Sequence, residues 1–306
     1  MDFSYLVKII RLGRIHFLTA GFLTFTSGAL LAGVLTGQFS LDKFLWGYLV
    51  LLPAHLSISY SNDYFDWEAD HFIKPNLFSG GSGILVENPE LRSTSRNIAV
   101  GLILTSIFLA ILFSILYLSP LFLLLVIFGN LLGWFYSAPP LKLSYRGLGE
   151  IAMMISGFII PGLGYLTIAG LIDLKFIIFS IPSMLYQFVF ILSVELPDRK
   201  GDKKAGKNTF VVKYNIKTSL LLILLFAILG SVSFLVMGQS SIYPSVNFNL
   251  ITLLSLIPVI TVIGIYIKKV QFGLVNLTKY IVSSLILLIL LIDIYFLTLM
   301  ANILSI

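Results

Sequence analysis

The sequence predicts an all-α, polytopic membrane protein in which nine transmembrane helices form a bundle around a central cavity, capped by cytoplasmic loops. Three observations favour this fold class. The chain has 306 residues, 58% of them hydrophobic and only 11% charged, whereas a soluble domain of this size needs a polar surface. Its mean hydropathy is +1.00. Apolar runs of about 18 or more residues recur along the chain, which is the pattern of membrane spans.

The apolar runs divide the chain into nine predicted spans. They are continuous and lack the two-residue alternation of membrane β-strands. The third and fourth spans are joined by a very short turn at 119–121, so we expect them to form a tight hairpin. We expect residues 1–306 to form a single transmembrane domain. The predicted spans lie near 15–37, 42–61, 97–118, 120–136, 148–171, 174–194, 218–238, 248–267 and 280–303.

The basic residues predict the orientation of these spans. Eighteen of the 20 Lys and Arg residues lie in the N-terminal segment or in loops after even-numbered spans, and only Lys43 and Lys175 lie on the other side. Loops rich in Lys and Arg stay in the cytoplasm. We therefore expect a multi-pass protein of the cell membrane with a cytoplasmic N-terminus and an external C-terminus.

Two classes of chemistry are excluded at this stage. The net charge of +6 does not indicate a nucleic-acid partner, because the basic residues are spread over several loops and no soluble domain is present to hold a duplex. The chain contains no cysteine, which excludes disulfides and thiolate metal sites.

Acidic residues gather in two nine-residue segments, NDYFDWEAD at 62–70 and VELPDRKGD at 194–202. These segments hold seven of the 14 acidic residues and lie at the cytoplasmic ends of the second and sixth predicted spans. This pattern indicates a weak internal repeat of about four spans. A constant offset of 132 residues pairs Asp63 with Glu195, Asp66 with Asp198 and Asp70 with Asp202.

The spacing i, i+3, i+7 places the three carboxylates of each segment on one helical face. Like charges at this spacing repel each other, more strongly near a low-dielectric membrane. Mg²⁺ offsets such repulsion and prefers a few carboxylates together with water and phosphate oxygens. The two clusters are therefore predicted to form a diphosphate clamp. The alternative is that both are solvated loops that merely carry charge.

A diphosphate also needs fixed cations. The loops that follow the fourth and sixth spans supply basic residues, of which Lys142, Arg146 and Lys207 are the best phosphate candidates. The alternative explanation of these residues is the orientation rule alone. The remaining predicted substrate-binding residues are Arg199 in the second of these loops, Arg14 before the first span, and Tyr136 at the end of the fourth.

The loop after the second span is long and contains the sequence SGGSG at 79–83. Flexible glycines in a long loop suit a lid over a site. An ordinary flexible connection has the same composition, and the sequence does not separate these alternatives.

These motifs resemble those of the UbiA superfamily of intramembrane prenyltransferases. NDYFDWEAD is similar to the family's NDxxDxxxD motif. DRKGD, followed by GKNT at 206–209, is similar to its second DxxxD motif with a trailing GKxT. The segment YSAPPLKLSYRGLGE at 136–150 resembles the family segment between them. The resemblance covers nearly the whole chain.

The resemblance implies a function and a set of site residues. It implies Mg²⁺-dependent transfer of a polyprenyl group from a polyprenyl diphosphate, through an allylic cation, to a small aromatic or lipid acceptor within membrane lipid. Asp63, Asp66 and Asp198 take the catalytic roles. The implied metal-binding set is Asn62, Asp63, Asp66 and Asp70 in the first motif and Asp198 and Asp202 in the second.

The sequence departs from the family pattern at two places. Val194 stands where the second motif usually begins with Asn, and Leu77 and Phe78 replace a frequent Arg-Pro pair. This loop is more similar to the branch that prenylates 1,4-dihydroxy-2-naphthoate. Geranylgeranylglyceryl phosphate and 4-hydroxybenzoate are the alternative acceptors.

Two functions from other classes stay open. A secondary transporter is suggested by the repeat and by Asp293, a carboxylate inside the ninth span. A catalytically silent lipid-binding relative is suggested by Val194. The position of the acidic clusters at span ends, beside cations, favours the enzyme.

Overall fold

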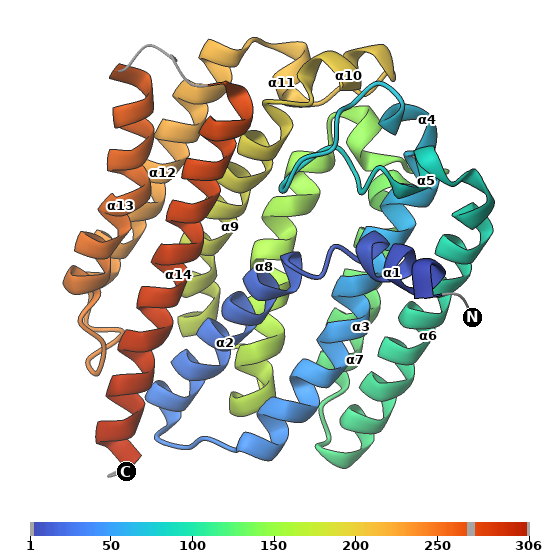
Figure 1. Ribbon diagram of the computed structural model, residues 1–306. Coiled ribbons are helices and arrows are strands. Elements are labelled where there is room, and N and C mark those ends of the chain that lie inside the picture. The colour runs from blue at the N-terminus through green and yellow to red at the C-terminus, as the bar shows by residue number, and fades with distance from the viewer. Residues whose placement is uncertain (1–2, 268–272, 305–306) are drawn as a thin grey trace.

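The computed structural model describes residues 3–267 and 273–304, and all regular structure in that part of the chain is helical. Nine helices in these residues are 18 residues or longer, and they run side by side as a bundle (Figure 1). Their bounds are α2 (Phe17–Thr36), α3 (Leu41–Phe65), α6 (Arg92–Leu116), α7 (Pro120–Ser137), α8 (Gly149–Ala169), α9 (Leu174–Glu195), α12 (Ile216–Gly238), α13 (Phe248–Ile267) and α14 (Leu274–Leu304).

Short helices gather around this bundle, most of them at the end shown uppermost in Figure 1. Several connect the long helices there, so they cap the end where the acidic segments lie. The short helices are α1 (Phe3–Leu12), α4 (Trp67–Asp70), α5 (Ile84–Glu87), α10 (Arg199–Lys204) and α11 (Phe210–Lys213), with 3₁₀ turns at Pro89–Leu91 and Leu143–Arg146.

Eight of the nine long helices are long and apolar enough to cross a membrane, so the prediction of a multi-pass helical membrane protein is confirmed. Among the described residues, α3 is the long helix that falls outside this set. Its last turns carry Ser57, Ser61 and Asp63, all buried. These polar residues, which precede the first acidic segment, lower the mean hydropathy of α3. The predicted membrane crossing at 42–61 therefore stays a prediction.

Local sequence features set where these helices begin. Asp173 precedes α9, and its side chain accepts a hydrogen bond from the Phe176 N–H at 2.9 Å. Asn215 precedes α12 and accepts from the Thr218 N–H, also at 2.9 Å. Such N-caps satisfy amide groups that have no partner inside the helix.

The backbones of α2 and α8 touch at two glycines. A Cβ atom at Gly28 would lie 1.9 Å from the carbonyl oxygen of Pro161, and one at Gly164 would lie 1.9 Å from that of Phe25. Only residues without a side chain permit this approach, a common feature of helix packing in membranes. The contact fixes α2 against the centre of the bundle.

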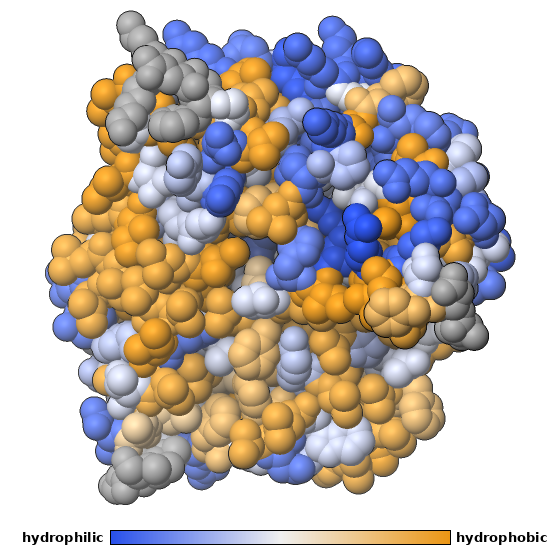
Figure 2. Space-filling view, viewed as in Figure 1, coloured by the Kyte–Doolittle hydropathy of each residue, from blue (hydrophilic) through white to orange (hydrophobic). Residues whose placement is uncertain are grey.

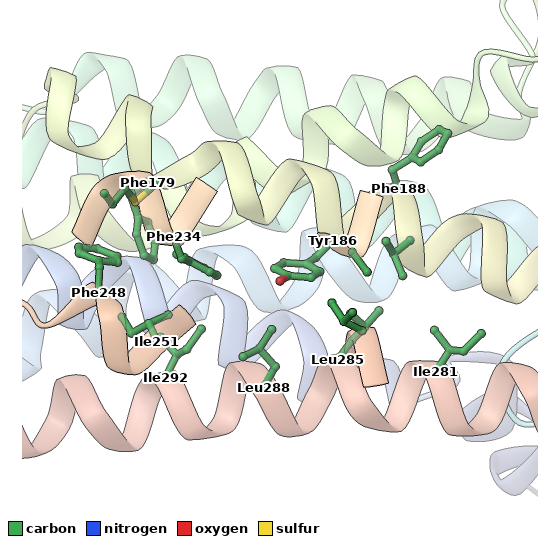
Figure 3. Packing of buried hydrophobic residues seen from close by; sticks show 14 of the residues in the cluster. Phe179, Tyr186, Phe188, Phe234, Phe248, Ile251, Ile281, Leu285, Leu288 and Ile292 are labelled. Carbon is green, nitrogen blue, oxygen red and sulfur yellow. The ribbon is translucent and has the colours of Figure 1, made fainter. Parts of the chain in front are cut away.

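A large apolar cluster fills the other half of the bundle, between α9, α12, α13 and α14. Figure 3 shows aromatic side chains of α9 and α12, including Phe179, Tyr186 and Phe234, on the side facing Leu285 and Leu288 of α14. On the outer surface, polar residues gather near the capped end, while apolar residues dominate the rest of the face in view (Figure 2). This distribution matches a protein whose capped end lies in water and whose body lies in lipid.

Candidate active site

Each of the two acidic segments runs across a break between a long helix and a short one. Asp66 lies between α3 and α4, and Asp198 lies directly before α10, after α9 has ended at Glu195. The Asp70 N–H donates to the Asp66 carbonyl and the Asp202 N–H donates to the Asp198 carbonyl, both at 2.9 Å. Because these i to i−4 bonds continue past each break, the carboxylates of each segment keep a helical spacing. The internal repeat stays a prediction, but residues paired by the offset of 132 make matching backbone hydrogen bonds here.

Both segments open onto one cavity of about 410 Å³. Its opposite end is apolar and reaches Phe179, Phe234, Leu288 and Ile292 deep in the bundle. The cavity thus has a charged end and a hydrocarbon-like end. The predicted site residues that line it are Arg14, Asn62, Asp63, Asp66, Asp70, Tyr136, Asp198, Asp202 and Lys207, together with Glu195.

Lys207 joins the two acidic segments. Its Nζ lies 3.1 Å from Asp66 Oδ2 and 3.8 Å from Asp202 Oδ1. Burial acts to lower the pKa of Lys207, but the two carboxylates outweigh burial and raise this pKa well above its usual value. Asp66 also accepts hydrogen bonds from Ser137 Oγ and Tyr145 Oη, each at 2.9 Å.

Residues 79–83, here called the glycine loop, lie over the carboxylates of both segments. Asp198 accepts hydrogen bonds from Ser79 Oγ and from the Gly80 N–H, each at 2.9 Å. Asp63 accepts from the Ser82 hydroxyl and from its N–H, the latter at 3.2 Å to Oδ2. The sequence indicated either a lid or a plain connection, and these contacts place the loop directly on the acidic residues.

The carboxylates are crowded and poorly solvated. Burial, reinforced by Asp63 and Asp66, raises the pKa of Asp70 to about 8. Burial raises the pKa of Asp198 to about 7 and that of Asp202 to about 6, with hydrogen bonds from the glycine loop and the charge of Lys207 acting in the opposite direction. Additional positive charge at this end of the cavity would therefore stabilise the ionised carboxylates.

The donor atoms fit a divalent cation that shares its ligands with a phosphate. Among the described residues, no three acidic or imidazole groups form a protein-only metal site. Mg²⁺ seldom needs one, because it takes one or two carboxylates and completes its shell with water and phosphate oxygens. Asn62 Oδ1, Glu195 Oε2 and Arg14 Nη2 are all buried without hydrogen-bond partners. Oxygen acceptors and an arginine donor left unpaired beside the same cavity are what a metal–diphosphate ligand would satisfy.

Three predicted phosphate-binding residues do not line this cavity. The Lys142 ammonium lies 5.0 Å from the centre of the Tyr145 ring. Arg146 donates to the Pro140 carbonyl at 2.8 Å, and Arg199 donates to the Val211 carbonyl at 2.9 Å. Their roles as substrate ligands stay predictions, whereas the geometry brings Arg14 and Lys207 to the cavity.

The sequence did not predict that Ser137 and Tyr145 donate hydrogen bonds to Asp66. Ser137 and Tyr145 lie within the segment 136–150, in which only Tyr136, Lys142 and Arg146 were predicted as site residues. Tyr and Ser hydroxyls in the same loop were the available signal. The partner of Asp293 also emerges only from the structure: its Oδ1 accepts a hydrogen bond from Ser27 Oγ, across 266 positions of sequence.

Comparisons with known proteins agree with this geometry. Residues 21–273 match the family model described as the UbiA prenyltransferase family. The fold matches a UbiA homolog from Archaeoglobus fulgidus bound to GPP and Mg²⁺, with a TM-score of 0.67, 16% identity and coverage of 97% of this chain and 100% of that one. It also matches the structure of a digeranylgeranylglyceryl phosphate synthase, with a TM-score of 0.63, 17% identity and coverage of 95% and 98%. A comparison with curated proteins finds no match.

The fold and the paired acidic segments therefore define a multi-pass membrane prenyltransferase. The chain belongs to the UbiA prenyltransferase family. Prenyl transfer is accordingly its class of activity.

Proposed function

We propose that this protein transfers a polyprenyl group from a polyprenyl diphosphate to an acceptor, with Mg²⁺ held between the two acidic segments. The observation that carries the proposal is the single cavity with carboxylates and cations at one end and an apolar channel at the other. That polarity matches a lipid with a diphosphate head and a hydrocarbon tail. The solved relatives bound to Mg²⁺ with GPP or with DMAPP support it.

Asn62, Asp63, Asp66, Asp70, Asp198 and Asp202 would hold the metal ions. When bound, Mg²⁺ supplies positive charge that stabilises the departing diphosphate. Lys207 and Arg14, the two cations that line the cavity among the residues the structure describes, contact the phosphate oxygens in this proposal. Lys142, Arg146 and Arg199 would attract the anionic head from outside the cavity.

The reaction breaks the bond between the prenyl C1 and the diphosphate oxygen, and the electron pair leaves with the diphosphate. A nucleophilic atom of the acceptor forms a new bond to C1 and then loses a proton. The apolar walls keep water from capturing the allylic cation. Tyr136 lines the charged end of the cavity, where its ring can stabilise positive charge that develops on the prenyl group.

For the acceptor, we propose an aromatic quinone precursor such as 1,4-dihydroxy-2-naphthoate. The loop pattern around Leu77 and Phe78 supports this branch of the family. Geranylgeranylglyceryl phosphate and 4-hydroxybenzoate are the alternative acceptors. In this proposal the protein resides in the cell membrane, with its N-terminus and active site in the cytoplasm and its C-terminus outside, as the Lys and Arg distribution favours.

The test is diphosphate release by the purified protein in lipid, with geranylgeranyl diphosphate as donor. Each of the three acceptors, and buffer alone, is supplied with Mg²⁺ or with EDTA. We expect Mg²⁺-dependent release and a prenylated product with one acceptor. Asp66→Asn and Asp198→Asn should each lower the rate by about 100-fold or more, because each removes charge from the clamp. Full activity in both variants, at wild-type folding, would refute the proposal.

A further inference from the structure

A second set of polar side chains lines the same cavity, deeper in the bundle than the acidic segments. His55 of α3, Asn130 of α7 and Gln187 of α9 belong to three different walls of this cavity. We call these three residues the inner polar set. None of them belongs to the paired acidic motifs.

The inner polar set follows the internal repeat. His55 and Gln187 are 132 positions apart, the offset that relates the two acidic segments. Each lies eight residues before the first carboxylate of its segment, Asp63 or Glu195. At a rise of 1.5 Å per residue this places them about 12 Å along their helices from the acidic end. The two halves of the protein therefore present a polar side chain at the same depth.

Within the described part of the chain, the side chains of His55 and Gln187 and one atom of Asn130 have no hydrogen-bond partner. Among residues 3–267 and 273–304, no hydrogen bond is made by the imidazole of His55 or by the amide of Gln187. Asn130 is only 6% exposed. Its Nδ2 donates to the Val126 carbonyl at 2.9 Å and to Ser106 Oγ at 3.4 Å, whereas its Oδ1 is buried without a partner. Polar groups inside a protein destabilise it unless a partner satisfies them.

His55 is also held in place. A Cβ atom at Gly21 of α2 would lie 2.2 Å from His55 Nδ1, so the imidazole packs directly on the backbone of α2. The position therefore combines a fixed imidazole with free hydrogen-bonding capacity. Fixed polar groups of this kind orient ligands in apolar pockets.

The charges of the residues around the inner polar set indicate which kind of ligand it binds. The cations that line the cavity within the described residues, Arg14 and Lys207, belong to its acidic end. A phosphate or other anion is therefore not matched by the inner polar set. A prenyl tail offers no hydrogen-bonding atom and does not explain the set either. The ligand must therefore be uncharged at this point and must carry a hydrogen-bonding atom. A hydroxyl or carbonyl oxygen on an aromatic ring meets both requirements.

We propose that His55, Asn130 and Gln187 bind the hydroxyl or carbonyl oxygens of an aromatic acceptor and so determine which acceptor is used. This inference rests on the proposed prenyl transfer. The ring of the acceptor lies between the inner polar set and the diphosphate clamp, so its reactive atom faces the prenyl C1. The three residues position the acceptor and take no part in breaking the bond to diphosphate.

Equilibrium binding tests this assignment without turnover. The full-length protein in lipid is saturated with Mg²⁺ and geranylgeranyl thiodiphosphate, a slowly reacting donor analogue. The binding of 1,4-dihydroxy-2-naphthoate, 4-hydroxybenzoate and geranylgeranylglyceryl phosphate is then measured separately. The variants are His55→Phe and Gln187→Met, which keep the size of the side chain, and His55→Gln, which restores a hydrogen-bonding group. Ser156→Ala is the matched control, because the Ser156 hydroxyl lines the cavity but already donates to the Met153 carbonyl.

We expect the wild type to bind a phenolic probe and each of the first two variants to weaken that binding by about tenfold or more. His55→Gln should recover part of the loss, Ser156→Ala should bind like wild type, and the affinity for the thiodiphosphate should stay within about twofold. The inference is overturned if the wild type binds the thiodiphosphate but no phenolic probe, if it binds only geranylgeranylglyceryl phosphate, or if the variants leave probe binding unchanged. An equal loss for probe and thiodiphosphate also overturns it. Failure of the wild type to bind the thiodiphosphate with Mg²⁺ counts instead against the proposed prenyl transfer.

Discussion

Lys207 Nζ lies 3.1 Å from Asp66 Oδ2, although 141 positions separate the two residues in the chain. The same ammonium lies 3.8 Å from Asp202. Lys207 therefore places a positive charge between carboxylates of the two acidic segments. In the metal-free protein it links the two acidic segments, and in the proposed complex it lies beside the diphosphate.

We expect Lys207→Met to lower the melting temperature of the metal-free protein. Removing one partner of a buried ion pair leaves charge without compensation and costs about 3 kcal/mol or more. Saturating Mg²⁺ should recover part of the loss, since the cation replaces the missing charge. Thermal unfolding with and without Mg²⁺ measures both effects. Lys203→Met is the control, because Lys203 is exposed on α10. Equal melting temperatures for the two variants would contradict the expectation.

The raised pKa values predict how stability depends on pH. Asp70 and Asp198 have pKa values of about 8 and about 7 in the folded protein, against about 3.9 in an unfolded chain. Between these values the folded state holds protons that the unfolded state has lost. The contribution of these groups is therefore fully present below about pH 4 and is lost as the pH rises through about 7 to 8.

The metal-free protein should accordingly melt at a lower temperature near pH 8 than near pH 5, and Asp70→Asn should reduce this difference. Mg²⁺ binds ionised carboxylates, so the increase in melting temperature that it causes should be larger near pH 8. Thermal unfolding at both pH values, with Mg²⁺ or EDTA, provides the measurement. An Mg²⁺ effect of the same size at both would argue against these carboxylates as ligands.

Gly81 should prove necessary for the glycine loop to lie on the acidic segments. Its φ is +64° and a Cβ atom there would lie 2.4 Å from Asp70 Oδ2, so Gly81→Ala should displace the loop from the carboxylates. Faster cleavage within residues 74–87 under limited proteolysis would report this displacement. Gly170→Ala is a matched control, because Gly170 has a φ of +76° but no atom within 4 Å of its added Cβ. If both variants are cleaved at wild-type rates, the loop does not depend on this contact.

The contact between α2 and α8 should tolerate no added side chain. Gly28→Ala and Gly164→Ala each place a methyl group against a backbone carbonyl, and we expect a loss of about 1–3 kcal/mol or more in the free energy of unfolding. Melting temperature and the yield of folded protein in detergent are the measurements. Gly101→Ala in α6 should be neutral or slightly stabilising, because nothing lies within 4 Å of that position. A wild-type melting temperature for both Gly28→Ala and Gly164→Ala would mean that α2 and α8 can move apart without loss of stability.

Much of this arrangement was predictable because membrane spans and acidic motifs are local features of sequence. Length and apolar character predicted eight of the membrane helices, and the repeated spacing predicted that Asp63, Asp66, Asp70, Asp198 and Asp202 would meet. The spacing was sufficient because each segment lies at the end of a long helix, where residues three or four positions apart lie on the same face. The ninth span, predicted at 42–61, corresponds to α3, which is not among these eight because its apolar character fades before the acidic segment.

The remaining features depend on which helices become neighbours, and one sequence does not contain that information. From the sequence, Lys142 and Arg146 seemed as suitable as Lys207 for binding phosphate, because all three are basic residues in the loops that follow the fourth and sixth predicted spans. The fold directs only Lys207 into the cavity. The Ser27 partner of Asp293 and the contacts of the glycine loop arise in the same way, from elements that meet only after the bundle has formed.

The limited apolar character of α3 has a consequence for how the chain enters the membrane. A segment with polar and ionisable groups near one end gains less free energy on leaving water than its neighbours do. α3 makes its most extensive packing with α6, the next long helix to be synthesised. We therefore expect α3 to depend on α6 for stable integration during biosynthesis. A nascent chain that stops before residue 92 would leave the first acidic segment on a helix without its principal support.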